Sequence, residues 1–268
     1  MNLSYAYKLN GVATGYPAGR TPRVVARGLS AELKTGRLTA LVGANGVGKS
    51  TLLRTMAGFQ PPLDGSLTLF DRPLKSYSAR QLARQVAVVT AARPIVGGLT
   101  VAEVVALGRM PYTGLTGRLS AFDREAVDKA LRRSGANHLA DRDFGGLSDG
   151  ERAKVMMARA LAAETPVVLL DELTAFLDLG AAAHIWTLLT DITRDGTHTV
   201  LLSTHDIEAA LRLADQLWLL TPQGLSVGTP AQLIETGEVE NAFATPELAF
   251  DATARRFSMV MAAPTRPN

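Results

Sequence analysis

The sequence predicts an α/β protein. Short apolar runs rich in β-branched residues recur along the chain, with helical patterns between them. The first third carries strand patterns interrupted by glycine and proline, which is typical of an antiparallel sheet. Over residues 94–146 the pattern becomes helical, at 100–107 and 123–133, which indicates a helical insertion between two core strands. We expect the buried strands at residues 38–42, 85–90, 167–170, 199–203 and 217–220.

The composition excludes several classes of protein. The chain has 268 residues, of which 47% are hydrophobic and 20% charged, so it can fold around a large core. It has no cysteine, which excludes disulfide frameworks and thiolate metal sites. Its 28 basic and 25 acidic residues give a charge of +3 without a run of like charge, so nucleic acid is not an expected partner.

Neither a membrane span nor a signal peptide is expected. The long uncharged stretch at 216–234 contains prolines and glycines, and the first residues lack a continuous apolar core. No internal repeat is visible. The length allows one large domain or two smaller ones. The last residues, 264–268, are expected to form a disordered tail.

A glycine-rich motif, GANGVGKS, covers residues 43–50. It follows a predicted strand and opens a predicted helix, which is the context that a phosphate-binding loop requires. Its glycines let the backbone approach phosphate oxygens, and the helix N-terminus adds positive potential. Lys49 is expected to reach the β- and γ-phosphates, and the Ser50 hydroxyl is expected to bind Mg²⁺.

Two carboxylates end a later strand and complete this pattern. In VVLLDE, at residues 167–172, four apolar residues form the strand, Asp171 faces the metal and Glu172 is placed to polarise a water molecule. A carboxylate at a strand end can also be a simple helix cap. Combined with the phosphate loop, the pair predicts binding and hydrolysis of a nucleoside triphosphate.

The motif LSDGE at residues 147–151 lies just upstream of the acidic strand. It resembles the signature motif of ABC ATPases, and the helix that follows resembles the signature helix of that family. Read alone, Ser148 and Glu151 form a capping box before an apolar helix. Both interpretations hold together, because a helix N-terminus binds anions for the same reason that it needs a cap.

Other residues fit the same resemblance. The segment AFLD, which ends at Asp178, resembles the D-loop, although Asp178 could simply cap a helix. His205, after a predicted strand, resembles the switch histidine near the γ-phosphate. Tyr16 resembles the aromatic residue that stacks on adenine.

The segment LGRMPYTG, at residues 107–114, resembles the helical region of subunits that energise iron–siderophore, haem and cobalamin importers. If the resemblance is set aside, the segment is interpreted as the end of a helix that Pro111 interrupts, in a loop with an exposed basic and an exposed aromatic side chain.

Three positions depart from the family pattern. Ala91 occupies the place of the Q-loop glutamine, so coupling to a membrane partner is in question. Asp149 replaces the first signature glycine, and its carboxylate must point away from a γ-phosphate, be neutralised by a neighbour such as Arg152, or weaken closure of the dimer. Leu173 replaces the usual proline after Glu172, which removes a backbone constraint but no chemical group.

The resemblance implies a single ABC-type ATPase domain over residues 1–263. Its P-loop core would carry an antiparallel β subdomain and a helical subdomain, the latter formed by residues near 94–146 and the signature helix. It implies that two copies of the chain enclose ATP, with Glu172, His205 and Lys49 as catalytic residues and Ser50 and Asp171 as Mg²⁺ ligands. One copy contributes Tyr16, Gly43, Ala44, Asn45, Gly46, Val47, Gly48, Lys49, Ser50, Thr51 and Asp171. The other copy contributes Ser148, Asp149, Gly150, Glu151 and Asp178.

The expected function is ATP hydrolysis that powers import of an iron–siderophore or related metal chelate. The expected partners are a second copy, transmembrane permease subunits and, indirectly, a substrate-binding protein, with the chain held at the cytoplasmic face of the cell membrane. The alternative is a soluble ABC ATPase in cofactor assembly or regulation. Ala91 and Asp149 also leave open a regulatory subunit that barely hydrolyses ATP.

Overall fold

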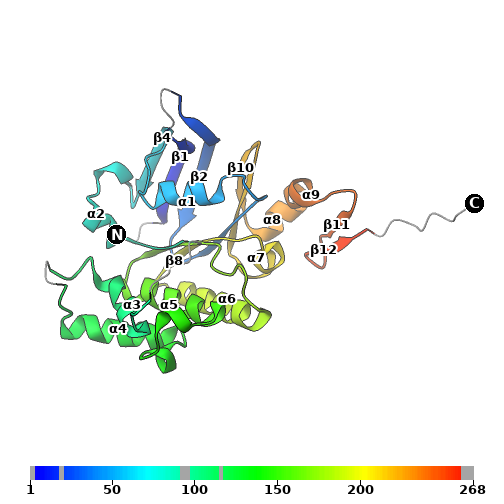
Figure 1. The fold of residues 1–268 in the computed structure, drawn as a ribbon. Helices are drawn as coiled ribbons and strands as arrows, with labels where there is room; N and C mark the ends of the chain where they lie inside the picture. Colours follow the sequence, from blue (N-terminus) through cyan, green and yellow to red (C-terminus); the bar gives the residue numbers. More distant parts are fainter. Residues whose placement is uncertain (1–3, 18–20, 91–96, 115–116, 261–268) are drawn as a thin grey trace, which may run out of the picture.

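The computed structural model describes residues 4–17, 21–90, 97–114 and 117–260. They form a central six-stranded sheet, a four-stranded antiparallel sheet on one side of it and a group of helices on the other (Figure 1). This architecture confirms the predicted α/β class with an antiparallel β subdomain and a helical part. The expected tail at 264–268 lies outside the described residues.

The central sheet has the strand order β10-β9-β3-β8-β7-β6. Its pairs are parallel except for the β9–β10 hairpin. All five predicted strands are present, and each end differs from the prediction by no more than one residue. The strands are β3 (Leu38–Val42), β6 (Val86–Val89), β7 (Val167–Asp171), β8 (Thr199–Ser203), β9 (Gln216–Thr221) and β10 (Gly224–Gly228).

The second sheet has the order β2-β1-β4-β5 and is antiparallel throughout, as the glycine and proline pattern predicted. It contributes β1 and β2 to the region beside the phosphate loop. The strands are β1 (Tyr5–Tyr16), β2 (Arg23–Lys34), β4 (Asp64–Leu69) and β5 (Arg72–Pro73).

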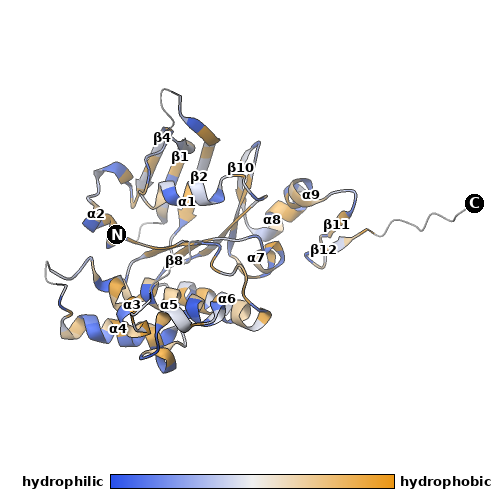
Figure 2. Cartoon of the chain, in the orientation of Figure 1, coloured by the Kyte–Doolittle hydropathy of each residue, from blue (hydrophilic) through white to orange (hydrophobic). Residues whose placement is uncertain are grey.

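The central sheet separates two hydrophobic cores. In β7, Val168 and Leu170 pack in the core that contains the large helices, whereas Val167 and Leu169 pack in the core shared with α1 and the antiparallel sheet. Because successive side chains of a strand point to opposite faces, a strand buried on both faces must be apolar at every position. Figure 2 shows these strands as apolar, whereas α4 and α5 carry both apolar and polar residues.

Helices connect and cover the strands, and several are single turns of 3₁₀ type. The α-helices are α1 (Lys49–Met56), α2 (Ala79–Ala83), α3 (Val101–Ala106), α4 (Ala121–Arg133), α5 (Asp149–Ala162), α6 (Leu179–Arg194), α7 (Ile207–Leu213), α8 (Pro230–Glu235) and α9 (Glu238–Phe243). The 3₁₀ turns are η1 (Leu74–Ser76), η2 (Leu107–Arg109), η3 (Asn137–Leu139) and η4 (Phe144–Gly146).

The helical segment, residues 97–114 and 117–146, leaves the core and rejoins it at neighbouring positions. Thr100 forms a β-bridge with Asp143, and the Phe144 amide donates to the Leu99 carbonyl at 2.9 Å. Capping boxes start its helices, with Thr100 before α3 and Ser120 before α4. Helix α4 consequently begins two residues before the predicted start, because its N-cap serine was not recognised in the sequence.

The interpretation of residues 107–114 as a loop with an exposed basic side chain is wrong. Arg109 is 5% exposed and its Nε lies 2.9 Å from Asp123 Oδ1. Its Nη1 lies 2.7 Å from Glu164 Oε2 and donates to the Ala162 carbonyl at 2.8 Å. Tyr112 is half-buried, and the centroid of its ring lies 4.1 Å from Cζ of Arg109. These partners are remote in sequence, so the local pattern could not reveal them.

The last part of the described chain forms a hairpin that the sequence did not predict, β11 (Leu248–Asp251) with β12 (Arg256–Met259). Phe250 and Phe257 stack across it with centroids 4.8 Å apart. The Phe257 amide donates to Glu208 of α7, and Arg255 donates to the Leu211 carbonyl. The hairpin is therefore attached to the helix that follows β8.

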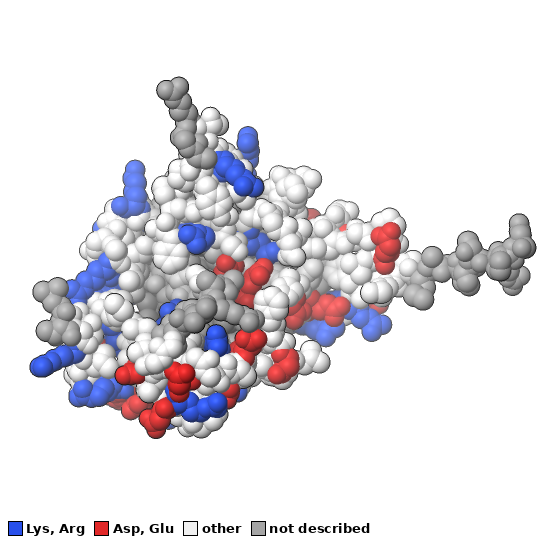
Figure 3. Space-filling view, viewed as in Figure 1, with Lys and Arg blue, Asp and Glu red and all other residues white. Residues whose placement is uncertain are grey.

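No helix within the described residues is long and apolar enough to cross a lipid bilayer. Figure 3 shows lysine and arginine side chains interspersed with aspartate and glutamate on this face of the molecule.

Replacement of Arg109 with alanine is expected to lower the free energy of unfolding by about 3 kcal/mol, because the buried carboxylate of Asp123 loses its cation. Chemical denaturation at pH 7 measures the change. The control is Arg132→Ala, which removes an exposed arginine from α4, the helix that carries Asp123, and should change stability by less than about 0.5 kcal/mol. Equal losses in the two variants would contradict the proposed importance of the buried pair.

The difference in the free energy of unfolding between the parent protein and Arg109→Ala is expected to depend on pH. Hydrogen bonds from Ser120, together with Arg109, lower the pKa of Asp123 from its ordinary value to about 2. A depressed carboxylate pKa stabilises the fold above the unfolded-state pKa, and this contribution disappears as the pH falls through the folded-state pKa. The difference between the parent protein and Arg109→Ala should therefore shrink between about pH 4 and pH 2.

Candidate functional site

The glycine-rich loop connects β3 to α1 and requires glycine at its two ends. Gly43 has φ 156°, and a Cβ there would lie 2.2 Å from the Leu220 carbonyl oxygen. Gly48 has φ 118°, and its Cβ would lie 2.8 Å from Val25 Cγ1. A side chain at either position would therefore displace the loop.

Lys49 begins α1 and is 5% exposed. Its Nζ donates to the carbonyls of Gly43 at 2.8 Å and Ala44 at 3.3 Å, inside the curve of the loop. Burial lowers the pKa of the Lys49 ammonium from its ordinary value, and the nearby carboxylates of Glu172 and Asp171 partly oppose this effect. No side chain caps α1, so its N-terminal amide groups are available to an anion.

Asp171 lies at the carboxyl end of β7, beside the start of α1. Its Oδ1 accepts hydrogen bonds from Ser50 Oγ and Ser203 Oγ, each at 3.0 Å. The sequence predicted that Ser50 and Asp171 act together, and the structure brings them together. Ser203 was not predicted from the sequence, although it ends β8 and pairs in register with Asp171. Its place at the end of a predicted parallel strand was the available signal.

Glu172 follows Asp171 and has a left-handed backbone, with φ 52°. Its amide donates to the Ser203 carbonyl at 3.0 Å, while the next residue, Leu173, is buried. Such a backbone is unfavourable for a residue with a side chain, and it is held here by the surrounding strands. The backbone strain therefore lies at the residue that the sequence predicts to be catalytic.

A hollow of about 440 Å³ joins the loop to the antiparallel sheet. Tyr16, at the end of β1, is 42% exposed, and its Oη lies 3.2 Å from Thr51 Oγ1. Arg23, Val24 and Val25 of β2 complete the wall, and the sequence analysis did not identify them. The lining is Tyr16, Arg23, Val24, Val25, Gly46, Gly48, Lys49, Ser50, Thr51 and Glu172.

The residues assigned to a second copy lie apart from this hollow, at the starts of α5 and α6. Ser148 caps α5 in a reciprocal capping box with Glu151. Asp178 caps α6 by accepting from the Ala181 amide at 2.8 Å. The two helix starts are adjacent, since a Cβ on Gly150 would lie 3.0 Å from Ala181 Cβ. The interpretation of Ser148 and of Asp178 as helix caps is therefore confirmed.

Five further residues were named in the sequence predictions, and the structure describes four of them. His205 is exposed two residues after β8, and it does not line the hollow. Arg152, considered as a partner for Asp149, donates to the Leu147 carbonyl at 3.4 Å and lies over the Phe144 ring. Ala91, at the Q-loop position, lies outside the described residues. Asn45 and Val47 are part of the phosphate loop, and the Val47 amide donates to the Ala44 carbonyl.

The parallel sheet, the loop after β3 and the acidic end of β7 together define a P-loop nucleotide-binding protein. Comparison with known proteins identifies its family. The chain matches the ABC transporter family over residues 26–175, more than half of its length. The chain belongs to this family and binds ATP.

Two curated relatives are similar over most of the chain. The ferric enterobactin transport ATP-binding protein of Escherichia coli is 34% identical over 82% of this chain and 81% of that protein. The hemin import ATP-binding protein of Streptomyces coelicolor is 36% identical over 84% of this chain and 79% of that protein.

Two solved structures share the fold. One, described as an inward-facing conformation of a metal-chelate type ABC transporter, has a TM-score of 0.77 at 26% identity, over 95% of each chain. The other, cbiO1 from Clostridium perfringens, part of the ABC transporter complex cbiONQ, has a TM-score of 0.75 at 27% identity, over 89% of this chain and 94% of that chain.

Replacement of Ser203 with alanine is expected to weaken binding of ATP with Mg²⁺ about fivefold, because one hydrogen bond that orients Asp171 is lost. Binding of ATP in the presence of a chelator should be unchanged. Calorimetric titration measures both affinities. The control is Ser226→Ala on β10, which should alter neither affinity. An equal loss with and without the metal would contradict an effect that acts through Asp171.

Proposed function

We propose that this chain is the ATP-hydrolysing subunit of an importer for an iron–siderophore or a related metal chelate such as haem or cobalamin. The observation that supports the hydrolytic part is that Lys49, Ser50 and Glu172 line one hollow at the edge of the sheet, with Asp171 hydrogen-bonded to Ser50. The importer class is supported by relatives named for ferric enterobactin transport and hemin import.

The loop and α1 bind the phosphates of ATP. Backbone amides of the loop and the uncapped start of α1 offer donors, and Lys49 exchanges its carbonyl partners for phosphate oxygens. Tyr16 stacks on adenine at the mouth of the hollow, and its hydroxyl stays near Thr51. Val25 also lines the hollow, close to Gly48.

Ser50 and Asp171 are the proposed Mg²⁺ ligands. The Ser50 hydroxyl and the Asp171 carboxylate oxygen, 3.0 Å apart, are the hard oxygen donors that would hold this ion. An ion held there would neutralise phosphate charge. Ser203 holds the Asp171 carboxylate in place from the neighbouring strand.

Glu172 is the proposed general base, because its side chain lines the hollow next to Lys49 and Ser50. It accepts the proton of the attacking water, and its position depends on the left-handed backbone described above. His205 follows β8 at the same edge of the sheet and is proposed to contact the γ-phosphate when the site closes.

The second copy supplies the other half of the site. Ser148, Gly150 and Glu151 lie at the start of α5, outside the hollow of their own chain, so a ligand can join them only across an interface. Asp149 and Asp178 belong to the same surface. ATP thus holds two copies together, and its hydrolysis lets them separate.

The helical segment is proposed to contact the permease. It is inserted between β6 and β7 and is attached to the signature helix α5 through Arg109. One structural relative is part of a multisubunit transporter complex, which supports this kind of partner. The permease would hold the chain at the cytoplasmic face of the cell membrane, with a substrate-binding protein acting on the other side.

The variant Glu172→Gln is expected to keep ATP affinity, to lose hydrolysis by about a hundredfold or more, and to accumulate as an ATP-bound dimer, because the base is removed and the phosphate loop is kept. Phosphate release and size-exclusion chromatography with light scattering measure these properties. Hydrolysis at the parental rate would show that Glu172 is not the base. The control is Lys49→Ala, which should lose ATP affinity and therefore form no ATP-dependent dimer.

The importer assignment is tested with tagged Glu172→Gln protein, purified from gently solubilised membranes in the presence of ATP. We expect a polytopic membrane protein to be recovered with it at close to one-to-one stoichiometry, and Lys49→Ala should recover much less. Recovery only as a dimer, or with non-membrane partners, would contradict the importer and favour a non-transport ABC ATPase.

A further inference from the structure

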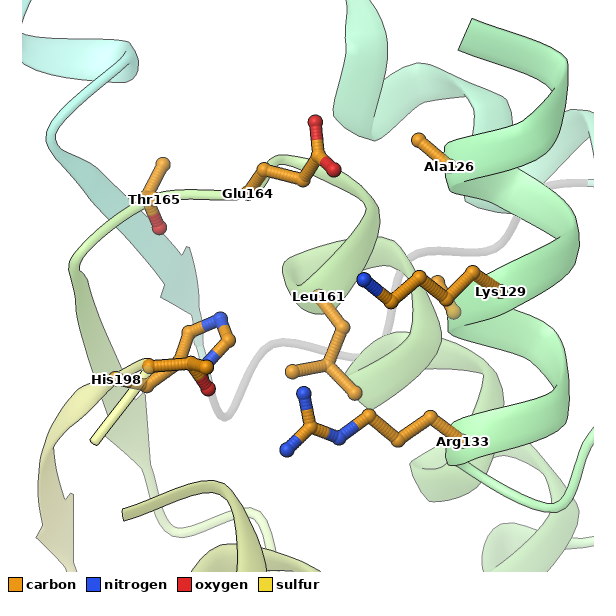
Figure 4. A pocket seen from close by; sticks show the side chains of 9 residues that line it. Ala126, Lys129, Arg133, Leu161, Glu164, Thr165 and His198 are labelled. Atoms are coloured by element: carbon orange, nitrogen blue, oxygen red, sulfur yellow. The ribbon is translucent and has the colours of Figure 1, made fainter. Parts of the chain in front are cut away.

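A second hollow lies at the opposite end of the central sheet, close to the starts of β7 and β8. It has a volume of about 210 Å³, and α4, the end of α5 and the turn before β8 surround it (Figure 4). It shares no lining residue with the ATP site. The lining is Ala126, Lys129, Ala130, Arg133, Leu161, Glu164, Thr165, Thr197 and His198.

The charged side chains that line this hollow are more often basic than acidic. Two cations, Lys129 and Arg133, line the hollow together with one carboxylate, Glu164. Arg133 is paired with Asp195 outside the lining, and Glu164 shares Arg109 with Asp123. Lys129 forms no ion pair within the described residues, and the lining side chains themselves carry more positive than negative charge.

His198 presents a hydrogen-bonding atom to the same space. It is 8% exposed, and Figure 4 shows its ring directed into the hollow. The Thr197 hydroxyl lies 2.5 Å from Asp195 Oδ1 and 2.6 Å from His198 Nδ1. Because the single hydroxyl proton goes to the carboxylate, Nδ1 must carry a proton and donate it to Thr197. The neutral ring therefore has an unprotonated Nε2.

The protonation of His198 is sensitive to a neighbouring negative charge. Burial, followed by Arg133 and Lys129, lowers the pKa of His198 from its ordinary value, and Asp195 acts in the opposite direction. An anion in the hollow would offset the two cations and let Nε2 take up a proton. The protonated ring can then donate a hydrogen bond to the anion that allowed it to form.

We propose that this hollow binds a small oxyanion of the phosphate type, held by Lys129 and by protonated His198, with Arg133 beside it. The apolar side chains of Ala126, Ala130 and Leu161 leave room for a short organic group, so a phosphate monoester also fits the chemistry. The bound anion connects α4 of the helical segment to the strand that leads to Ser203, and it stabilises their relative position.

The test uses the four histidines of the chain as local probes in nuclear magnetic resonance. Each ring resonance is assigned by a single His→Gln variant, and inorganic phosphate is titrated into the parent protein between pH 5 and pH 8. Phosphate is expected to raise the pKa of His198 by about one and to bind about tenfold more tightly at the acid end. Binding of phosphate at the P-loop does not interfere, because the His198 signal reports its own surroundings.

The matched pair of variants is Lys129→Ala and Arg132→Ala, which remove exposed cations from the same helix inside and outside the hollow. The first is expected to weaken the effect on His198 at least about fivefold, and the second to leave it unchanged. An unchanged His198 signal at saturating phosphate, or an equal loss in both variants, would overturn the proposal. The outcome is independent of the ATPase assignment, since neither variant touches the ATP site.

Discussion

The parallel pairing of β3, β7 and β8 is the constraint on which the remainder of the structure depends. Parallel strands end at one edge, so this pairing places the loop after Val42, the carboxylate of Asp171 and the hydroxyl of Ser203 side by side. The same pairing needs cover on both faces, which the antiparallel sheet and the large helices provide. Catalytic geometry and core packing are therefore consequences of a single topology.

The charged groups of the molecule are used in two different ways. At the phosphate edge, Lys49 is buried with carbonyl partners that it can exchange for a ligand. In the helical segment, Arg109 is buried among carboxylates and a carbonyl that already satisfy its donors. A satisfied buried cation fixes the packing of its neighbours, whereas one held by weak carbonyl acceptors can respond to an anion. This difference in hydrogen-bond partners distinguishes the structural role of Arg109 from the phosphate-binding role proposed for Lys49.

Much of the fold and the core of the site could be predicted from local sequence. The strands buried on both faces are continuous apolar runs, and the loop residues 43–50 have fixed spacing, so both are visible without tertiary information. The burial of Arg109 could not be predicted, because Asp123 and Glu164 are brought to it only by packing. The β11–β12 hairpin was missed for a similar reason, since its aromatic pair is stabilised by contacts with α7. The left-handed backbone of Glu172 likewise depends on its hydrogen bond to the adjacent strand.

The β-bridge that joins the two ends of the helical segment has an evolutionary consequence. The chain enters and leaves this segment through neighbouring positions, joined by the bridge between Thr100 and Asp143. The exposed parts of this segment can change in length or sequence without altering the register of β6 and β7, provided that its buried residues, including Arg109 and Asp123, keep their packing. Selection can therefore reshape the surface offered to a partner while the phosphate edge is inherited intact, and one hydrolytic core can serve many different cargoes.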